Sequence, residues 1–518
     1  MSVVFLTEAG KEYGVGHMTR CDAIAQALYE QWKKSVFIID APQDVTLSLT
    51  HKTLSGIKWQ NNWPALNKIM TELNLTDKIE GIFVDSYYAS RGLLEKLAVF
   101  NVPLFFMDDY CRLDYPKGAI INPEISAKES LYYKKSGRTV YAGIQYLPLR
   151  SPFWDMEVPP YTKRKGIVVT MGGSGDQRCL NLIMEKLTVN VSEPIILVAP
   201  DNQIQCALSP NVTVVSNRQS AEYMQTLIST ARVIICGGGG TLIEAARSGT
   251  PAVVVKMADN QQNNIKAWTQ LGFARYAGEK NSPDLAINAI KHLAELDNYD
   301  IWKEASEKGF SCVDGQGARR ITGIILSETE GMAKSAILKE NIKIGTLYLK
   351  NFLRCTSAEH ELIRNAKNSP VVRAGSINQQ IVTLSRHQAF ILTLGTSTTG
   401  GYWLMYNGET ALGVVSLVEI DWYRSQATLG YYKLPDYPGK GVGKILVSAA
   451  KDITFDRLGL NILLAECLAD NIASLKSMEA AGLTNVASEE RNIGGKCTVI
   501  LKYETHKEGY GNYSDNRS

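Results

Sequence analysis

Short apolar runs alternate with longer amphipathic stretches along the first two thirds of the chain. The apolar runs have the length of buried strands, and they lie at 3–6, 35–40, 81–85 and 103–109, and then at 166–171, 194–198, 233–236 and 252–255. Continuous apolar strands separated by helices are typical of a parallel sheet covered on both faces. We therefore predict an α/β fold with two doubly wound, Rossmann-like domains, residues 1–155 and 156–330, facing each other across a cleft.

The last third of the chain has another pattern. Two apolar segments, 411–420 and 427–432, predict neighbouring strands, and a glycine-rich segment then leads into an amphipathic helix. A further strand is predicted at 462–467, and a helix begins at Asn471. We predict an α+β domain over residues 343–505, joined to the preceding part through residues 330–345.

Composition narrows the class of protein. The chain has 518 residues, 45% hydrophobic and 21% charged, with a net charge of +3, which is ordinary for a globular protein and carries no nucleic-acid signal. No apolar run reaches the roughly 18–20 residues of a spanning helix, and the N-terminus lacks signal-peptide features. Nine cysteines without a C-x-x-C pair indicate reduced thiols and no zinc site. We expect a cytoplasmic protein, and the composition indicates neither nucleic acid nor a membrane as a partner.

The first glycine turn follows the first predicted strand. It carries Gly14, Gly16 and His17 and leads into a helix that includes Arg20. Free N–H groups at a helix N-terminus favour anions, and a histidine there can act as a general base. The alternative is a plain strand–helix turn whose histidine packs or caps.

The second glycine turn follows the strand at 233–236. Its residues Gly239, Gly240 and Thr241 open a helix and leave backbone N–H groups for phosphate oxygens. Glu244 lies one helical turn further, where a carboxylate can accept from ribose hydroxyls. Asn260 and Gln261 follow the next strand. Together these features predict a nucleotide-sugar site, and the absence of a G-x-x-x-x-G-K-[ST] motif argues against a P-loop ATPase.

Residues 1 to about 325 resemble the UDP-sugar hydrolases of pseudaminic acid biosynthesis. The segments that carry the resemblance are 14–21, 84–87, 107–109, 149–153, 172–174, 238–244, 260–261 and 314–320. The resemblance implies the GT-B fold of MurG-like glycosyltransferases, and attack of water at the anomeric carbon of UDP-2,4-diacetamido-2,4,6-trideoxy-β-L-altropyranose without a metal. It assigns catalysis to His17, as the base, and to Asn260. The substrate-binding residues that it implies are Gly14, Gly16, Arg20, Asp85, Gly173, Ser174, Gly239, Gly240, Thr241, Glu244 and Gln261.

The C-terminal domain resembles the GNAT acetyltransferases, specifically the N-acetyltransferase that acts before the hydrolase in the same pathway. The resemblance rests on the glycine loop, on Asn471, and on Arg364 and His387. It implies that acetyl-CoA is the co-substrate and that Asn471 contacts its pantetheine or thiol end. The loop residues that would hold its pyrophosphate are Gly439, Lys440, Gly441, Val442, Gly443 and Lys444. Two positions depart from the family pattern, because Pro438 replaces the usual Gln or Arg and Met478 replaces the tyrosine that protonates the leaving thiolate.

These observations predict a bifunctional enzyme. The C-terminal domain would acetylate the amine of a UDP-4-amino-4,6-dideoxy sugar, and the N-terminal pair of domains would hydrolyse the product. Two alternatives stay open. One is a GT-B glycosyltransferase that passes the sugar to an acceptor other than water. The other is a hydrolase whose GNAT-like domain binds without catalysing.

Overall fold

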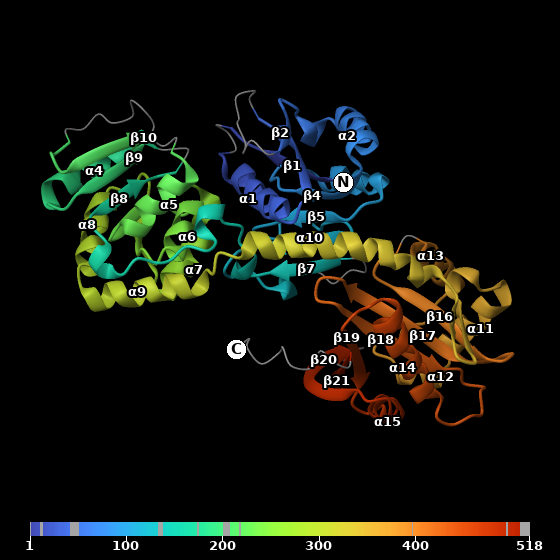
Figure 1. Ribbon diagram of the computed structural model, residues 1–518. Helices are drawn as coiled ribbons and strands as arrows, with labels where there is room; N and C mark the ends of the chain where they lie inside the picture. Colours follow the sequence, from blue (N-terminus) through green and yellow to red (C-terminus); the bar gives the residue numbers. More distant parts are fainter. Residues whose placement is uncertain are drawn as a thin grey trace. The chain divides into compact units, whose positions relative to one another are not determined.

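The computed structural model describes residues 2–10, 14–41, 51–132, 138–172, 176–199, 208–216, 219–395, 397–493 and 496–507. Gly173 and Ser174, predicted to bind substrate, lie outside these residues. The chain forms two compact units, one of residues 1–134 and 140–325 and the other of residues 135–139 and 326–518. The first unit holds two parallel sheets and the second unit a mostly antiparallel one (Figure 1). The boundary predicted at residue 155 stays a prediction.

The first sheet has the strand order β3-β2-β1-β4-β5-β6-β7, and its pairs from β3 to β6 are parallel. The strands are β1 (Ser2–Glu8), β2 (Lys34–Asp40), β3 (Lys52–Ser55), β4 (Ile79–Val84), β5 (Leu104–Met107), β6 (Gly118–Asn122) and β7 (Arg138–Ala142), and the helices are α1 (Gly16–Glu30), α2 (Trp63–Asp77) and α3 (Arg91–Lys96). The strand order reverses between β1 and β4. Parallel sheets bind ligands at the carboxyl ends of the strands beside such a switch point.

The second sheet is also parallel, with the order β10-β9-β8-β11-β12-β13. Its strands are β8 (Ile167–Thr170), β9 (Ile195–Ala199), β10 (Val212–Ser216), β11 (Val233–Gly237), β12 (Ala252–Lys256) and β13 (Ala274–Glu279). The helices are α4 (Gln177–Asn190), α5 (Ala221–Thr230), α6 (Gly240–Arg247), α7 (Gln262–Leu271), α8 (Leu285–Leu296) and α9 (Tyr299–Cys312). Helix α10 (Gly317–Lys334) follows them and returns to the first sheet, where Thr322 donates to the Ile24 carbonyl of α1. The switch point of the second sheet lies between β8 and β11, so the glycine turn after β11 stands where a ligand is expected.

The third sheet has the order β14-β15-β16-β17-β18-β19-β21-β20. Its strands are β14 (Ile342–Ile344), β15 (Leu347–Asn351), β16 (Gly401–Asn407), β17 (Thr410–Asp421), β18 (Gln426–Lys433), β19 (Ile462–Leu468), β20 (Thr484–Ile493) and β21 (Lys496–His506), and its helices are α11 (Ser357–Asn368), α12 (Pro370–Ala374), α13 (Leu384–Leu394), α14 (Val442–Asp452) and α15 (Ile472–Ala480). Among the described residues of this sheet, β18 and β19 pair in parallel, and the other neighbouring strands pair in antiparallel. The predicted fold class, two Rossmann-like sheets and a C-terminal α+β domain, is confirmed.

Candidate functional site

The turn between β1 and α1 has the conformation that its glycines allow. Gly14 has a φ of +72°, in the left-handed region that favours glycine, and its backbone exchanges hydrogen bonds of 3.0 and 2.7 Å with Gly10. Helix α1 then begins at Gly16, where an added Cβ would meet open space. The N-cap residue, Val15, makes no side-chain capping hydrogen bond. The first N–H groups of α1 therefore remain suited to an anionic ligand.

His17 lies in the first turn of α1 and is only 6% exposed. Its Nδ1 is 2.7 Å from Oδ1 of Asp85, the residue that follows β4. Burial opposes ionisation of Asp85, but the charges of Arg20 and His17 outweigh it and hold the pKa of Asp85 well below its usual range. An ionised carboxylate only accepts hydrogen bonds, so Nδ1 of His17 carries a proton and Nε2 is left as the basic nitrogen.

Arg20 joins two aspartates beside this histidine. Its Nε and Nη2 donate to Asp85, the second over 2.6 Å, and its Nη1 and Nη2 donate to Asp109 over 2.8 and 3.1 Å. Burial lowers the pKa of Arg20, yet Asp109 and Asp85 outweigh burial and raise it. The structure therefore uses Arg20 to hold two carboxylates in place, and its predicted contact with substrate stays a prediction.

Glu8, at the end of β1, lies on the Nε2 side of the His17 imidazole. It is fully buried, and its carboxylate accepts from Ser86 Oγ at 2.6 Å, from Gln60 Nε2 at 2.9 Å and from the Tyr87 N–H at 2.9 Å. Its Oε1 is 4.0 Å from Nε2 of His17. The Tyr87 ring meets the imidazole edge-on with centroids 4.3 Å apart, and its hydroxyl donates to Asp109. The imidazole is thus fixed from two sides by groups on neighbouring strand ends.

Gln261 stabilises the glycine turn of the second sheet through hydrogen bonds to its backbone. Its Oε1 accepts from the N–H groups of Gly238 at 3.2 Å and Met257 at 3.0 Å. Asn264 donates to the Gly238 carbonyl over 2.8 Å, and a Cβ on Gly238 would lie only 2.5 Å from Ile265. Gln261 therefore shapes the loop, and its predicted contact with the nucleotide stays a prediction.

Helix α6 begins beside this loop without a side-chain cap, with Gly239 at its N-cap and open space at Gly240. Thr241 is partly exposed in its first turn. Glu244 is buried, and its Oε1 accepts from Nε of Arg150 at 2.7 Å. Asn260 is exposed in the short 3-10 turn after β12. The hydrogen bonds of the described residues do not join Asn260 to His17, so their shared role stays a prediction.

The glycine loop of the third sheet also opens a helix. Gly441 has a φ of +78° and stands at the N-cap of α14, which has no side-chain cap. Lys440 and Lys444 are exposed on either side of it, and Lys433 donates to the Gly439 carbonyl over 3.0 Å. The side chain of Val442 is buried in the core of the third sheet. Bare N–H groups with flanking lysines suit a pyrophosphate.

Helix α15 packs tightly beside α14. A Cβ on Gly443 would lie 2.3 Å from Ser477 Oγ, so only glycine permits this approach. Asn471 caps α15 by accepting from the Ser474 N–H at 3.1 Å, and its Nδ2 donates to the Gly375 carbonyl over 2.9 Å. Both ends of this amide are engaged within the domain, and its predicted contact with acetyl-CoA stays a prediction.

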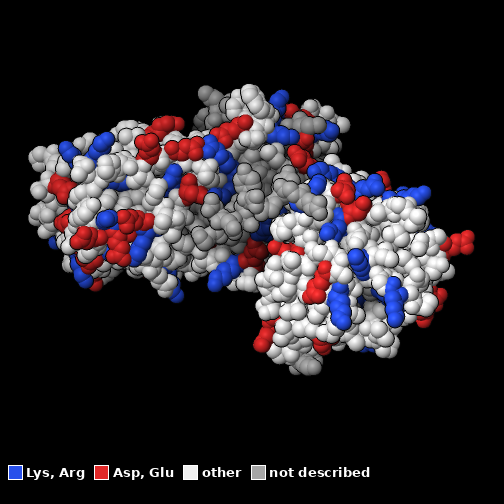
Figure 2. Space-filling view, turned by 60° about the horizontal axis from the view of Figure 1, so that its bottom comes forward, with Lys and Arg blue, Asp and Glu red and all other residues white. Residues whose placement is uncertain are grey.

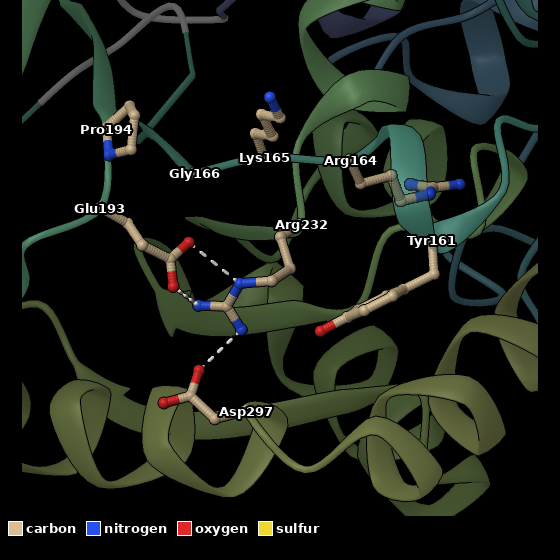
Figure 3. A pocket seen from close by; sticks show the side chains of 8 residues that line it. All are labelled: Tyr161, Arg164, Lys165, Gly166, Glu193, Pro194, Arg232 and Asp297. Carbon is tan, nitrogen blue, oxygen red and sulfur yellow. Dashed lines mark hydrogen bonds and ion pairs between the residues drawn. The ribbon is translucent and has the colours of Figure 1, made fainter.

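One hollow lies in the domain of the second sheet (Figure 3). Its lining residues Gly166, Pro194 and Arg232 directly precede β8, β9 and β11, so it is at the amino ends of the second sheet. The Arg232 guanidinium pairs with Glu193 and Asp297, each at 2.7 Å. One guanidinium is thus shared between two carboxylates, which indicates a structural ion-pair cluster.

Figure 2 shows basic and acidic side chains interspersed over the face in view. Within the described residues, no helix is long and apolar enough to cross a membrane, and no group of three or more His, Cys, Asp or Glu side chains could hold a metal ion.

Comparison with known proteins agrees with these two units. Residues 167–312 match the glycosyltransferase family 28 C-terminal domain, and residues 352–484 match the acetyltransferase (GNAT) domain. The acetyltransferase PseH of Campylobacter jejuni is 30% identical over 128 residues, which cover 25% of this chain and 78% of that protein. The chain belongs to the GNAT acetyltransferase family through its C-terminal part.

Two further relatives match more of the chain. The spore coat polysaccharide biosynthesis protein SpsG of Bacillus subtilis is 23% identical over 63% of this chain and 98% of its own length. The pseudaminic acid cytidylyltransferase and UDP-2,4-diacetamido-2,4,6-trideoxy-β-L-altropyranose hydrolase of Helicobacter pylori is 24% identical over 54% of this chain, which spans 49% of that protein. The resemblance predicted from the motifs, a hydrolase-like part and a GNAT acetyltransferase part, is confirmed.

Proposed function

We propose that this protein is a cytoplasmic, bifunctional enzyme of nonulosonic acid biosynthesis. It acetylates a UDP-4-amino-4,6-dideoxy sugar with acetyl-CoA, and it hydrolyses the resulting UDP-diacetamido-trideoxy sugar to UDP and free sugar. The observation that carries the hydrolase proposal is the His17–Asp85 pair at the switch point of the first sheet. The acetyltransferase proposal rests on the uncapped start of α14 after Gly441 and on the relationship to PseH.

In the proposed hydrolysis, Nε2 of His17 takes a proton from water while the water oxygen bonds to the anomeric carbon. The bond from that carbon to the phosphate oxygen breaks, and its electron pair leaves with UDP. Asp85 holds the imidazole and stabilises its protonated form. Asp85, Asp109 and Glu8 carry more negative charge than Arg20 offsets, which favours the positive charge that develops on the sugar.

In the proposed acetyl transfer, the free amine of the sugar attacks the thioester carbonyl. The new C–N bond forms, the nitrogen releases one proton, the C–S bond breaks, and CoA leaves as a thiolate that takes up a proton. The start of α14 holds the pyrophosphate, with Lys440 and Lys444 adding positive charge. The product of this step is the substrate of the hydrolase, so the two activities are consecutive.

A glycosyltransferase is the second candidate, because residues 167–312 match a glycosyltransferase family. The two candidates differ in the acceptor, which is water in one and a sugar or other hydroxyl compound in the other.

Mass spectrometry of the products tests the proposal. We expect the full chain, given a UDP-4-amino-4,6-dideoxy sugar and acetyl-CoA, to yield CoA, UDP and an acetylated free sugar. Without acetyl-CoA we expect little UDP. Release of UDP only after an acceptor sugar is added would favour the glycosyltransferase, and absence of any acetylated product would refute the acetyl transfer.

A further inference from the structure

The position that carries the thiolate-protonating tyrosine in the resembling family holds Met478 here. Met478 is 1% exposed and packs in the core of the third sheet with Val447 and Leu463. A thioether has no proton to donate. In the proposed acetyl transfer, the proton for the departing thiolate therefore comes from water or from another group of this domain.

The third sheet opens where β18 and β19 part. These parallel strands pair only as far as Leu429 and Ala465, while β18 stays paired with β17 beyond that point, Tyr431 opposite Val415. Helix α14 follows β18 and helix α15 follows β19, so both helices begin at the carboxyl ends of the parting strands (Figure 1). A ligand whose pyrophosphate rests on the start of α14 can extend into this opening.

Tyr431 lies in the opening. Its hydroxyl is 2.8 Å from Ser474 Oγ and 3.1 Å from the Ser474 carbonyl oxygen, in the first turn of α15. Its ring is 3.8 Å from the position of a Cβ on Gly443, in the first turn of α14. The phenol thus bridges the starts of the two helices, and it is only partly buried. Burial raises the pKa of Tyr431 to about 12, so the phenol keeps its proton at neutral pH.

We propose that Tyr431 is the catalytic acid of the acetyl transfer and protonates the departing CoA thiolate. This assignment rests on the proposed acetyltransferase function. As the C–S bond breaks, its electron pair goes to sulfur, the O–H bond of Tyr431 breaks, and the S–H bond of CoA forms. The tyrosinate regains a proton through the Ser474 hydroxyl, and the attacking nitrogen releases one proton to solvent, so the balance closes.

Tyr432 provides a matched control. It is the next residue of β18, but its ring packs against the core cluster on the other face of the sheet, and its hydroxyl donates to the Ile363 carbonyl over 3.4 Å. Loss of this hydroxyl also removes one partly buried hydrogen bond, and it leaves the opening between β18 and β19 unchanged.

The test compares Tyr431→Phe and Tyr432→Phe in the full chain. CoA release is followed with a thiol reagent, and acetyl-CoA affinity by calorimetry. We expect Tyr431→Phe to lower kcat by about 10²-fold, the effect of losing a positioned acid, with an acetyl-CoA Kd close to that of wild type. We expect Tyr432→Phe to keep kcat within a few-fold.

A second measurement separates an acid from a structural tyrosine. Difluorotyrosine incorporated at 431 lowers the pKa of the phenol, so the alkaline limb of the kcat profile should move to lower pH. The same residue at 432 should leave the profile unchanged. Wild-type kcat in Tyr431→Phe, or an unmoved limb with difluorotyrosine at 431, would overturn the assignment while acetyl transfer stands. A wild-type chain that releases no CoA would refute the acetyl transfer itself and this assignment with it.

Discussion

Nδ1 of His17 lies 2.7 Å from Oδ1 of Asp85, although the two residues are 68 positions apart in the chain. The contact forms because β1 and β4 are neighbours, and both the turn after β1 and the residue after β4 reach the same edge of the sheet. Asp85 is held ionised by Arg20, so it fixes both the orientation and the tautomer of the imidazole. The proposed hydrolysis depends on this arrangement.

The first test of the proposed hydrolysis removes its base, His17. We expect His17→Ala to slow UDP release from the diacetamido UDP-sugar by at least about 10²-fold, because water loses its proton acceptor. UDP affinity, measured by calorimetry, should change little. His292, which contacts Glu295 and the Tyr276 carbonyl in the same unit, provides the control, and His292→Ala should keep turnover. Equal turnover in His17→Ala and wild type would make His17 a structural residue.

Asp85→Asn should also impair hydrolysis. An amide can donate to Nδ1 and favour the wrong tautomer, so we expect kcat to fall by about 10²- to 10⁴-fold, as for a triad aspartate. Steady-state kinetics and the melting temperature are measured together, since the change also removes one partner of Arg20. Asp40, which ends the neighbouring strand β2, provides the control, and Asp40→Asn should leave kcat unchanged. An unchanged kcat in Asp85→Asn would show that Asp85 does not orient the base.

Glu124, just after β6, should make stability depend on pH. Burial, and then the charge of Asp109, raise the pKa of Glu124 from 4.5 to about 7, against an opposing effect of Arg20. No described group donates to its buried Oε2. Because the folded carboxyl binds its proton more tightly than the unfolded one, its contribution is fully present below about pH 4.5 and is lost as pH rises through about 7.

We therefore expect Glu124→Gln to match wild type in melting temperature at pH 4.5 and to exceed it at pH 8, by an amount equivalent to about 3 kcal/mol. Differential scanning calorimetry at both values measures the difference. Glu72→Gln, on an exposed position of α2, should show no such difference. Identical pH dependence in wild type and Glu124→Gln would contradict the burial of this carboxyl.

Gly441→Asp should abolish acetyl-CoA binding. It places a side chain in the left-handed region and a negative charge beside the proposed pyrophosphate, so we expect at least about 10²-fold weaker binding by calorimetry. Gly408, in the turn between β16 and β17, has a φ of +60° and the same open surroundings. Gly408→Asp carries the same backbone strain and should bind normally. Equal acetyl-CoA affinity in the two variants would show that the loop at Gly441 does not bind the cofactor.

The fold was predictable wherever a strand is buried on both faces. The segments at 81–85 and 103–109 became β4 and β5 because only a continuous apolar run suits the centre of a parallel sheet. Strand β20 was not predictable, since most of its residues are exposed and it lies at the sheet edge, where β21 is its neighbouring strand. Such a strand leaves no apolar alternation in the sequence.

The site was predictable in part for a similar reason. His17, Arg20 and Asp85 come together as their positions after β1 and β4 indicate. The role of Glu8 was missed, because its partners Gln60 and Ser86 are 52 and 78 residues away and no local pattern joins them. The place of Glu8 at the carboxyl end of β1, beside the switch point, is the signal that could have found it.

Hydrolysis in oxygen-18 water tests the central claim most directly. With the diacetamido UDP-sugar as substrate, attack of water on the anomeric carbon should place the label on the sugar and leave UDP unlabelled. Mass spectrometry of both products reads the outcome, and His17→Ala should slow the appearance of labelled sugar. Label in UDP, or no turnover until an acceptor sugar is added, would contradict the hydrolase mechanism.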